Sequence, residues 1–237
     1  MSRLVSIVID SMDHIAQARW WSDALGTPVV DERDDEASLA PLGAPEIVFV
    51  PVEEPKTGKN RIHLDLATYS LAEHAQLVAF LTDRGATRVD LGQGEVDWVV
   101  LADLEGNEFC VVEPRPAHFY VGRIATFMLE TAETQKTGEF WSTASGWQVL
   151  AHGPAGTVLR DPSWRGPYFV VGEHDDPTTT KNRIHLDVAP SVSDDHEIAV
   201  ERLVAAGAQR VDIGQGDVPW VVLVDPGGNE LCVLTPR

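Results

Sequence analysis

One long stretch of sequence occurs twice in this chain of 237 residues. The heptapeptide Lys59–Asp65 recurs letter for letter as Lys181–Asp187, 122 positions later. The correspondence continues without a gap to Arg115 and Arg237, and 32 of these 57 paired positions are identical. A repeat with so long a period indicates a duplicated domain rather than a solenoid of short units. Whatever site one half carries, the other half is expected to carry as well.

The repeat predicts two domains, residues 1–116 and 123–237, joined by a linker at 117–122. Each is long enough to bury a core of its own. Trp21 corresponds to Trp141 at an offset of only 120, so the second half has gained two residues before the shared heptapeptide. Since loops tolerate insertions, we expect the gain in the loop around Glu173–Thr180.

The chain is strongly acidic, with a formal net charge of −19 and a pI of about 4.6. This balance argues against nucleic acid or an anionic membrane as a partner. No apolar run approaches membrane-spanning length, and Met1–Leu4 does not begin a signal peptide. Cys110 and Cys232 are repeat equivalents in apolar segments, unlike a disulfide framework. They are typical of a reduced, cytoplasmic protein.

The apolar pattern predicts that each half contains two modules, each with a strand, a helix and three strands in that order. Ser11 is a candidate N-cap for a helix at 12–25 that ends at Gly26, and Ser70 with Glu73 forms a capping box for a second helix. The predicted strands of the first half are 4–9, 28–31, 37–42, 47–52, 61–67, 88–91, 98–102 and 108–112.

Two such modules per domain, with Asp103–Asn107 as a tight turn before the last strand, resemble the vicinal oxygen chelate superfamily. This group includes glyoxalase I, extradiol dioxygenases and bleomycin-resistance proteins. Segment 59–65 and the hairpin at 103–112 are similar to its glyoxalase-like branch, common in actinobacteria. The resemblance covers the whole chain and implies an α+β fold of two tandem domains. In each, paired βαβββ modules would curl into a mostly antiparallel cup around a cavity, with the helices outside.

The resemblance also implies one metal ligand on each of four strands. The corresponding residues are Ser6, Val50, His63 and Cys110 in the first domain, and Thr126, Val170, His185 and Cys232 in the second. Only the two histidines are of the expected type, and catalytic metal sites normally use three or more protein ligands. We therefore expect no metal and no cofactor. A histidine and a cysteine together do not exclude the binding of a divalent ion.

Strand alternation places His63 and Asp65 on one face, with Leu64 on the other. We predict that the pair faces the cavity, as do its copies His185 and Asp187. An imidazole beside a carboxylate can transfer protons near neutral pH, so these four residues are the candidate catalytic groups. Alternatively, neighbouring backbone or Arg61 satisfies the pair, and it only holds the cup in shape.

Further residues are candidates for ligand contact. Each of them has a plain structural alternative, which is core packing for tryptophan, solvent exposure for glutamate and burial for cysteine. Tryptophan at a cup's rim can stack on a flat or cationic ligand. The candidates are Trp98, Trp220, Glu108, Glu230, Cys110 and Cys232, together with Ser6, Val50, Thr126 and Val170.

Three functions remain open. The first is a glyoxalase-like lyase or isomerase without the usual metal, acting on a small carbonyl compound in a cavity of each domain. The second is binding without turnover, as in bleomycin-resistance proteins, of a cationic or aromatic small molecule. A metal-dependent dioxygenase or glyoxalase conflicts with Ser6, Val50 and Cys110. The tandem chain is expected to be a monomer with internal pseudo-twofold symmetry, or a homodimer.

Overall fold

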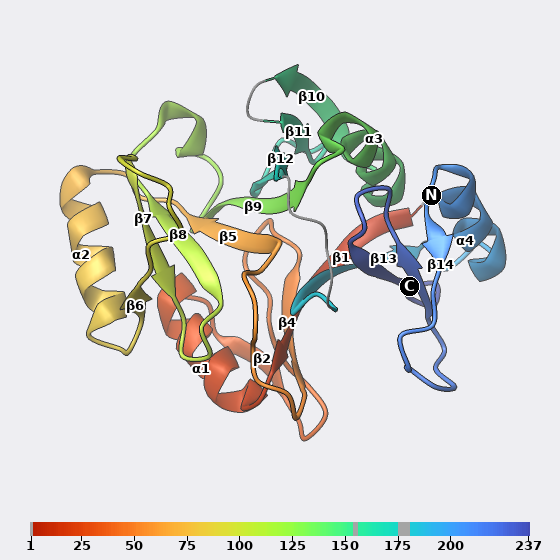
Figure 1. The fold of residues 1–237 in the computed structure, drawn as a ribbon, viewed down its shortest axis with the longest axis horizontal. Coiled ribbons are helices and arrows are strands. Elements are labelled where there is room, and N and C mark those ends of the chain that lie inside the picture. Colours follow the sequence, from red (N-terminus) through yellow and green to blue (C-terminus); the bar gives the residue numbers. More distant parts are fainter. Residues whose placement is uncertain (1, 154–155, 175–180) are drawn as a thin grey trace.

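The computed structural model describes residues 2–153, 156–174 and 181–237. In this part of the chain the elements follow the predicted order of strand, helix and three strands, four times over. Figure 1 shows two curved sheets with the helices on their outer sides. The first half contains β1 (Ser2–Ser11), α1 (His14–Leu25), β2 (Val29–Glu32), β3 (Ala37–Leu39), β4 (Glu46–Pro51), β5 (Ile62–Leu66), α2 (Leu71–Thr82), β6 (Thr87–Arg88), β7 (Trp98–Ala102) and β8 (Glu108–Val112).

A short 3-10 helix, η1 (Pro116–His118), lies in the linker between the halves. The second half contains β9 (Ile124–Thr131), α3 (Thr134–Ser145), β10 (Gln148–Gly153), β11 (Gly156–Arg160), β12 (Tyr168–Glu173), β13 (Ile184–Pro190), α4 (His196–Ala205), β14 (Gln209–Arg210), β15 (Val221–Val224) and β16 (Glu230–Val233). The α+β fold class is therefore confirmed. No helix among the described residues is long and apolar enough to cross a membrane.

The sixteen strands of the described residues form two eight-stranded sheets, and each sheet takes strands from both halves. One has the order β14-β15-β16-β13-β1-β4-β3-β2, and the other has the order β10-β11-β12-β9-β5-β8-β7-β6. We call the first the terminal cup, because it combines residues 2–51 with 184–233. The second, the central cup, combines residues 62–112 with 124–173. The seams are the antiparallel pairs β1–β13 and β5–β9.

This pairing differs from the arrangement expected from the sequence, in which both modules of one half close the same cup. Local pattern specifies each module, but it does not specify which other module completes its sheet. The repeat units 1–116 and 123–237 are therefore not the units that form the sheets.

The two modules of one half are instead joined through a helix. In the first half the Trp21 indole on α1 donates a hydrogen bond of 3.0 Å to Asp103, in the hairpin between β7 and β8. In the second half Trp141 on α3 donates one of 2.8 Å to Asp225. Both tryptophans are almost fully buried in a hydrophobic cluster that spans the halves. Because a buried indole N–H needs a partner, the Asp-x-x-Gly-Asn turn holds the helix as well as the hairpin.

Two local predictions need correction. Helix α1 is capped by Asp13, whose side chain accepts from the Ala16 amide, whereas the Ser11 hydroxyl donates to Glu105. The expected cap at Ser70 is present, since its side chain accepts from the Glu73 amide.

The two-residue gain of the second half also lies elsewhere. Leu39 pairs with Ile47, and Leu159 pairs with Phe169, so the offset grows from 120 to 122 within the β11–β12 hairpin. The predicted loop begins after that point, and its residues 175–180 lie outside the described part of the chain. Sequence identity could not locate the gain because the two hairpin tips share little sequence.

Candidate functional site

In the terminal cup, one row of side chains crosses the sheet on its concave face. Strand register places Cys232 beside Asp187, Asp187 beside Ser6, and Ser6 beside Glu46. These residues come from β16, β13, β1 and β4, so the row combines both ends of the chain. The Ser6 hydroxyl donates a hydrogen bond of 3.2 Å to Asp187 Oδ2, which fixes the carboxylate across the seam.

His185 lies one pleat along β13 from Asp187, on the same face. Its Nε2 is 3.6 Å from Asp187 Oδ1, and the two side chains are only 15% and 10% exposed. This distance is longer than a hydrogen bond. The same Oδ1 is buried and has no hydrogen-bond partner among the described residues. The pair therefore has one acceptor atom that a proton, a ligand or a cation could satisfy.

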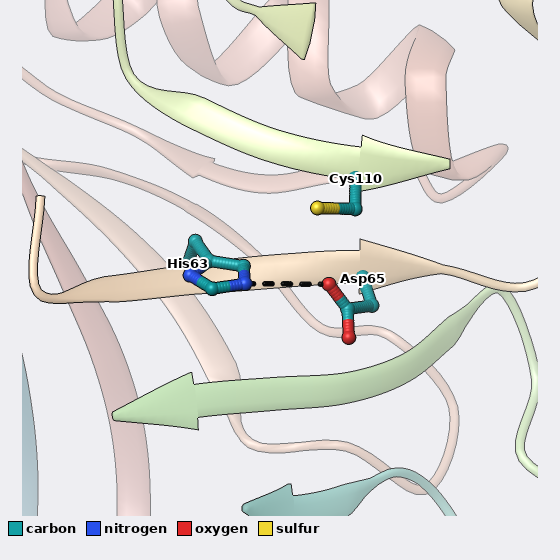
Figure 2. Close-up of side chains that lie close together, drawn as sticks. All are labelled: His63, Asp65 and Cys110. Atoms are coloured by element: carbon teal, nitrogen blue, oxygen red, sulfur yellow. Dashed lines mark ion pairs between the residues drawn. The ribbon is translucent and has the colours of Figure 1, made fainter. Parts of the chain in front are cut away.

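The central cup repeats this arrangement. Figure 2 shows His63 and Asp65 side by side on β5, with Cys110 reaching them from the neighbouring strand β8. His63 Nε2 is 3.5 Å from Asp65 Oδ1, and strand register places Asp65 beside Thr126. The sequence predicted that both His–Asp pairs lie on the face opposite the core residues Leu64 and Leu186, which agrees with the core. It placed Ser6 and Thr126 in the wrong cups, because each belongs with the pair of the other half.

Burial dominates the electrostatics of both clusters. Desolvation raises the pKa of Asp187 and Asp65, although the adjacent histidine in each case lowers it. Burial also raises the pKa of Cys232 and Cys110, and the neighbouring carboxylate raises it further. Both cysteines are free thiols. A thiol held protonated is a poor nucleophile, so the cysteines border the pairs without attacking a ligand.

A cavity of about 1,410 Å³ opens over the terminal cup. Its wall includes Ser6, Glu46, His185, Asp187 and Cys232. Val50, Trp220 and Glu230, which are candidate ligand-contact residues, also line it. The loop before β5 and segment 181–183 close its side, so residues of both halves surround one space.

The candidates of the central cup do not line this cavity. Glu108 forms an ion pair of 2.8 Å with Lys56, so its carboxylate is neutralised within the protein. Trp98 lies under the Arg115 guanidinium, whose carbon is 6.0 Å from the ring centroid. The position equivalent to Val170 is Val48 rather than Val50, because β4 and β12 have the offset of 122.

Sequence reasoning missed Glu46 altogether. Its structural equivalent is Tyr168, since Glu46 pairs with Ser6 and Tyr168 pairs with Thr126. The only sequence signal was alternation along β4, where Glu46, Val48 and Val50 share one face.

The metal implied by the resemblance can be tested against these atoms. His185, Asp187 and Cys232 offer three donor atoms within 4.8 Å of one another, as do His63, Asp65 and Cys110. An imidazole, a carboxylate and a thiolate suit zinc, which catalytic sites hold with three protein ligands. Asp187 Oδ1 is buried without a hydrogen-bond partner in the described residues, which agrees with such a site. The expected four-strand set is not reproduced, because β1 offers Ser6, and Glu46 of β4 is not among the clustered donor atoms. A zinc-like ion thus fits the cluster, although the sequence led us to expect no metal.

The sequence was compared with models of known protein families. The model of the glyoxalase-like domain matches residues 6–112 and again 126–234. The chain belongs to the glyoxalase-like domain family. This agrees with the expected superfamily, while its actinobacterial branch stays a prediction. The comparison with curated proteins found no significant match.

Solved structures support the fold of this glyoxalase-like chain over its whole length. Glyoxalase I from Zea mays is 13% identical, with a TM-score of 0.72 over 99% of this chain and 92% of that one. A candidate dioxygenase from Bacillus subtilis is 11% identical, with a TM-score of 0.66 over 99% of this chain and 85% of that one. At these identities the likeness shows the fold and leaves the reaction open.

Proposed function

We propose that the terminal cup is the active site of a lyase or isomerase that acts on a small carbonyl compound. The observation that carries this proposal is the His185–Asp187 pair, with one unpartnered carboxylate oxygen, on the wall of a cavity of about 1,410 Å³. A cavity of at least a few hundred Å³ with a few convergent polar groups is the usual form of a small-molecule site.

In this proposal His185 removes a proton from the carbon next to the carbonyl group. With Nε2 turned to Asp187, Nδ1 is the ring nitrogen left to exchange a proton with the ligand. The electron pair of the broken C–H bond forms an enolate, and Asp187 stabilises the imidazolium that results. In an α-hydroxycarbonyl compound the proton then returns to the former carbonyl carbon while the hydroxyl proton moves to the former carbonyl oxygen, which completes an isomerisation. Departure of a β-substituent with its electron pair completes an elimination instead.

Ser6 has a positioning part in this scheme. Its hydrogen bond to Oδ2 leaves Oδ1 facing His185, so the carboxylate stays in place while the proton moves. Long distances of this kind in a ligand-free site often shorten when the ligand binds. A bound zinc-like ion would be held by His185, Asp187 and Cys232, and it would supply Lewis-acid polarisation of the carbonyl oxygen.

The test is proton exchange with solvent. Small aldehydes, ketones and hydroxycarbonyl compounds are incubated with the protein in D₂O, and loss of the α-proton signal is followed by NMR. We expect at least one compound to exchange faster with the protein than without it, and His63→Ala combined with His185→Ala to remove the acceleration. Acceleration that survives in the folded double variant would refute the proposal.

Binding without turnover is the second candidate, and the cavity rim favours it. Trp220 is 37% exposed on the cavity wall, where it can stack on a flat ligand. Saturable binding of a compound that shows no exchange, unaffected by His185→Ala, would favour this candidate over catalysis.

A further inference from the structure

The two cups are alike along one half of their concave row and different along the other. Cys232 and Asp187 of the terminal cup have identical counterparts in Cys110 and Asp65, because these come from the exact repeat. Beyond the seam the row continues with Ser6 and Glu46 in the terminal cup, but with Thr126 and Tyr168 in the central cup. A ligand that reaches past the His–Asp pair therefore meets a carboxylate in one cup and a phenol in the other.

Glu46 lies on the cavity wall without a cationic partner among the described residues. Its Oε1 accepts a hydrogen bond of 2.7 Å from the buried Ser38 hydroxyl, which holds the carboxylate on the concave face. Ser38 is neutral, so the negative charge is positioned but not compensated. Glu230, at the other side of the row, accepts only from the Asn182 amide at 3.3 Å in the same part of the chain.

Four of the basic residues that line this cavity form ion pairs within the protein. Ion pairs join Lys181 to Asp10 at 2.5 Å and Arg183 to Glu105 at 2.9 Å. Two further pairs join Lys56 to Glu108 and Lys59 to Glu130. These four cations pair with carboxylates other than Glu46. Arg237 and Arg61 also line the cavity, and their charges act on Asp187 and Glu230 respectively. The uncompensated negative charge of the row therefore lies at Glu46.

The central cup supplies its own cations at the corresponding places. The Arg160 guanidinium lies over the Tyr168 ring, 4.1 Å from its centroid, and only 3% of this arginine is exposed. Its Nη2 donates to the Trp164 carbonyl at 3.0 Å. The position equivalent to Arg160 in the terminal cup is Ala40, because Leu159 and Leu39 occupy the same place in the register.

A second guanidinium repeats this contrast. Arg115 lies over Trp98 in the central cup, whereas no such contact joins Arg237 to Trp220 among the described residues. In the central cup, an arginine of the chain therefore lies near each of these two aromatic rings. In the terminal cup the equivalent tryptophan and the carboxylate at Glu46 face the cavity.

We propose that the terminal cup takes a small organic cation, an ammonium or guanidinium compound, and that Glu46 determines this specificity. Glu46 and Asp187 lie two strands apart, and strands are spaced roughly 4.8 Å apart, so the cation would lie on the order of 10 Å from the His–Asp pair. The ligand class is thus a small molecule with a carbonyl group at one end and a cationic group at the other. The cationic end of this ligand rests on the cavity of the proposed function but not on its chemistry, whereas the carbonyl end rests on the proposed function itself.

The test uses benzamidinium and its neutral analogue benzamide, with binding measured by titration calorimetry at low salt. We expect the wild-type protein to bind benzamidinium about tenfold more tightly than benzamide, because a charge-assisted contact forms with Glu46. Glu46→Gln should remove this preference, whereas Glu46→Asp, which keeps the charge, should retain part of it. Tyr168→Phe is the matched control in the central cup and should leave both affinities unchanged.

Equal affinity for the two probes, no measurable binding of either at millimolar concentration, or a preference that survives Glu46→Gln would each overturn the inference. These outcomes are separate from those of the exchange test. A chain whose α-proton exchange depends on His185 but whose cation preference does not depend on Glu46 keeps the proposed function and loses only the specificity.

Discussion

Ser6 donates a hydrogen bond of 3.2 Å to Asp187, across 181 positions of sequence. The donor lies on the first strand of the chain, and the acceptor lies in the repeated heptapeptide of the second half. Each His–Asp pair is thus completed by a strand of the other half, and neither half contains a whole cup. In the folded chain, the site is built from strands of both copies of the repeat.

This contact should contribute measurably to stability. Ser6→Ala removes a hydrogen bond to a buried carboxylate, so we expect a loss of about 1.5 kcal/mol in the free energy of unfolding. Ser2→Ala is the matched control on the same strand, because the Ser2 hydroxyl is buried without a partner in the described residues and its loss should cost little. Urea unfolding of both variants checks this, and equal effects would show that the Ser6 contact contributes nothing.

Burial of Asp187 predicts a pH dependence of stability. Desolvation raises its pKa above the ordinary 3.8, so the folded protein keeps this proton to a higher pH than the unfolded chain does. As pH rises from 3.8 through the raised pKa, the unfolded chain releases the proton first, and the folded state loses relative stability. Asp187→Asn cannot titrate, so its stability relative to the wild type should improve as the pH rises above 3.8 through the raised pKa.

Urea unfolding at several pH values in that window measures the difference directly. Asp97→Asn serves as the control, because the Asp97 side chain is 69% exposed. A difference between wild type and Asp187→Asn that stays constant with pH would contradict the assigned shift.

The packing of α3 against β11 predicts the effect of one glycine. A Cβ at Gly138 would lie 2.6 Å from the Cβ of Thr157, closer than real atoms approach. Although alanine favours helices, we expect Gly138→Ala to destabilise the protein by about 2 kcal/mol because the helix must move. Gly58→Ala, where nothing lies within 4 Å, should be nearly neutral. A stabilised Gly138→Ala variant in thermal unfolding would show that the helix does not pack this closely.

Exchange of modules between the halves predicts the behaviour of a single repeat. Residues 1–116 contain β1 and β5, and β5 has the same Ile-His-Leu-Asp sequence as β13. Strand β1 of one copy can therefore pair with β5 of another as β1 pairs with β13 in the whole chain. We expect this fragment to be a homodimer in light scattering after size exclusion, whereas a folded monomer would contradict the strand exchange.

Local features were predictable from the sequence. The four modules, and the placement of His63 and Asp65 on the sheet face opposite Leu64, follow from strand alternation, helical period and the repeat. The choice of partner module was not predictable, because the Ile-His-Leu-Asp segment that β5 and β13 share is compatible with either β1 or β9. Glu46 was missed for a related reason, since its repeat equivalent is Tyr168 and only three-dimensional register reveals the correspondence.

The most direct test of the central claim compares two single variants, His185→Ala and His63→Ala. Loss of a general base typically lowers a rate by 10²- to 10⁴-fold. We expect His185→Ala to lower the protein-dependent α-proton exchange rate by about 100-fold or more, and His63→Ala to leave it nearly unchanged. Normal exchange in a folded His185→Ala protein, or loss of exchange in His63→Ala alone, would contradict the assignment of the chemistry to the terminal cup.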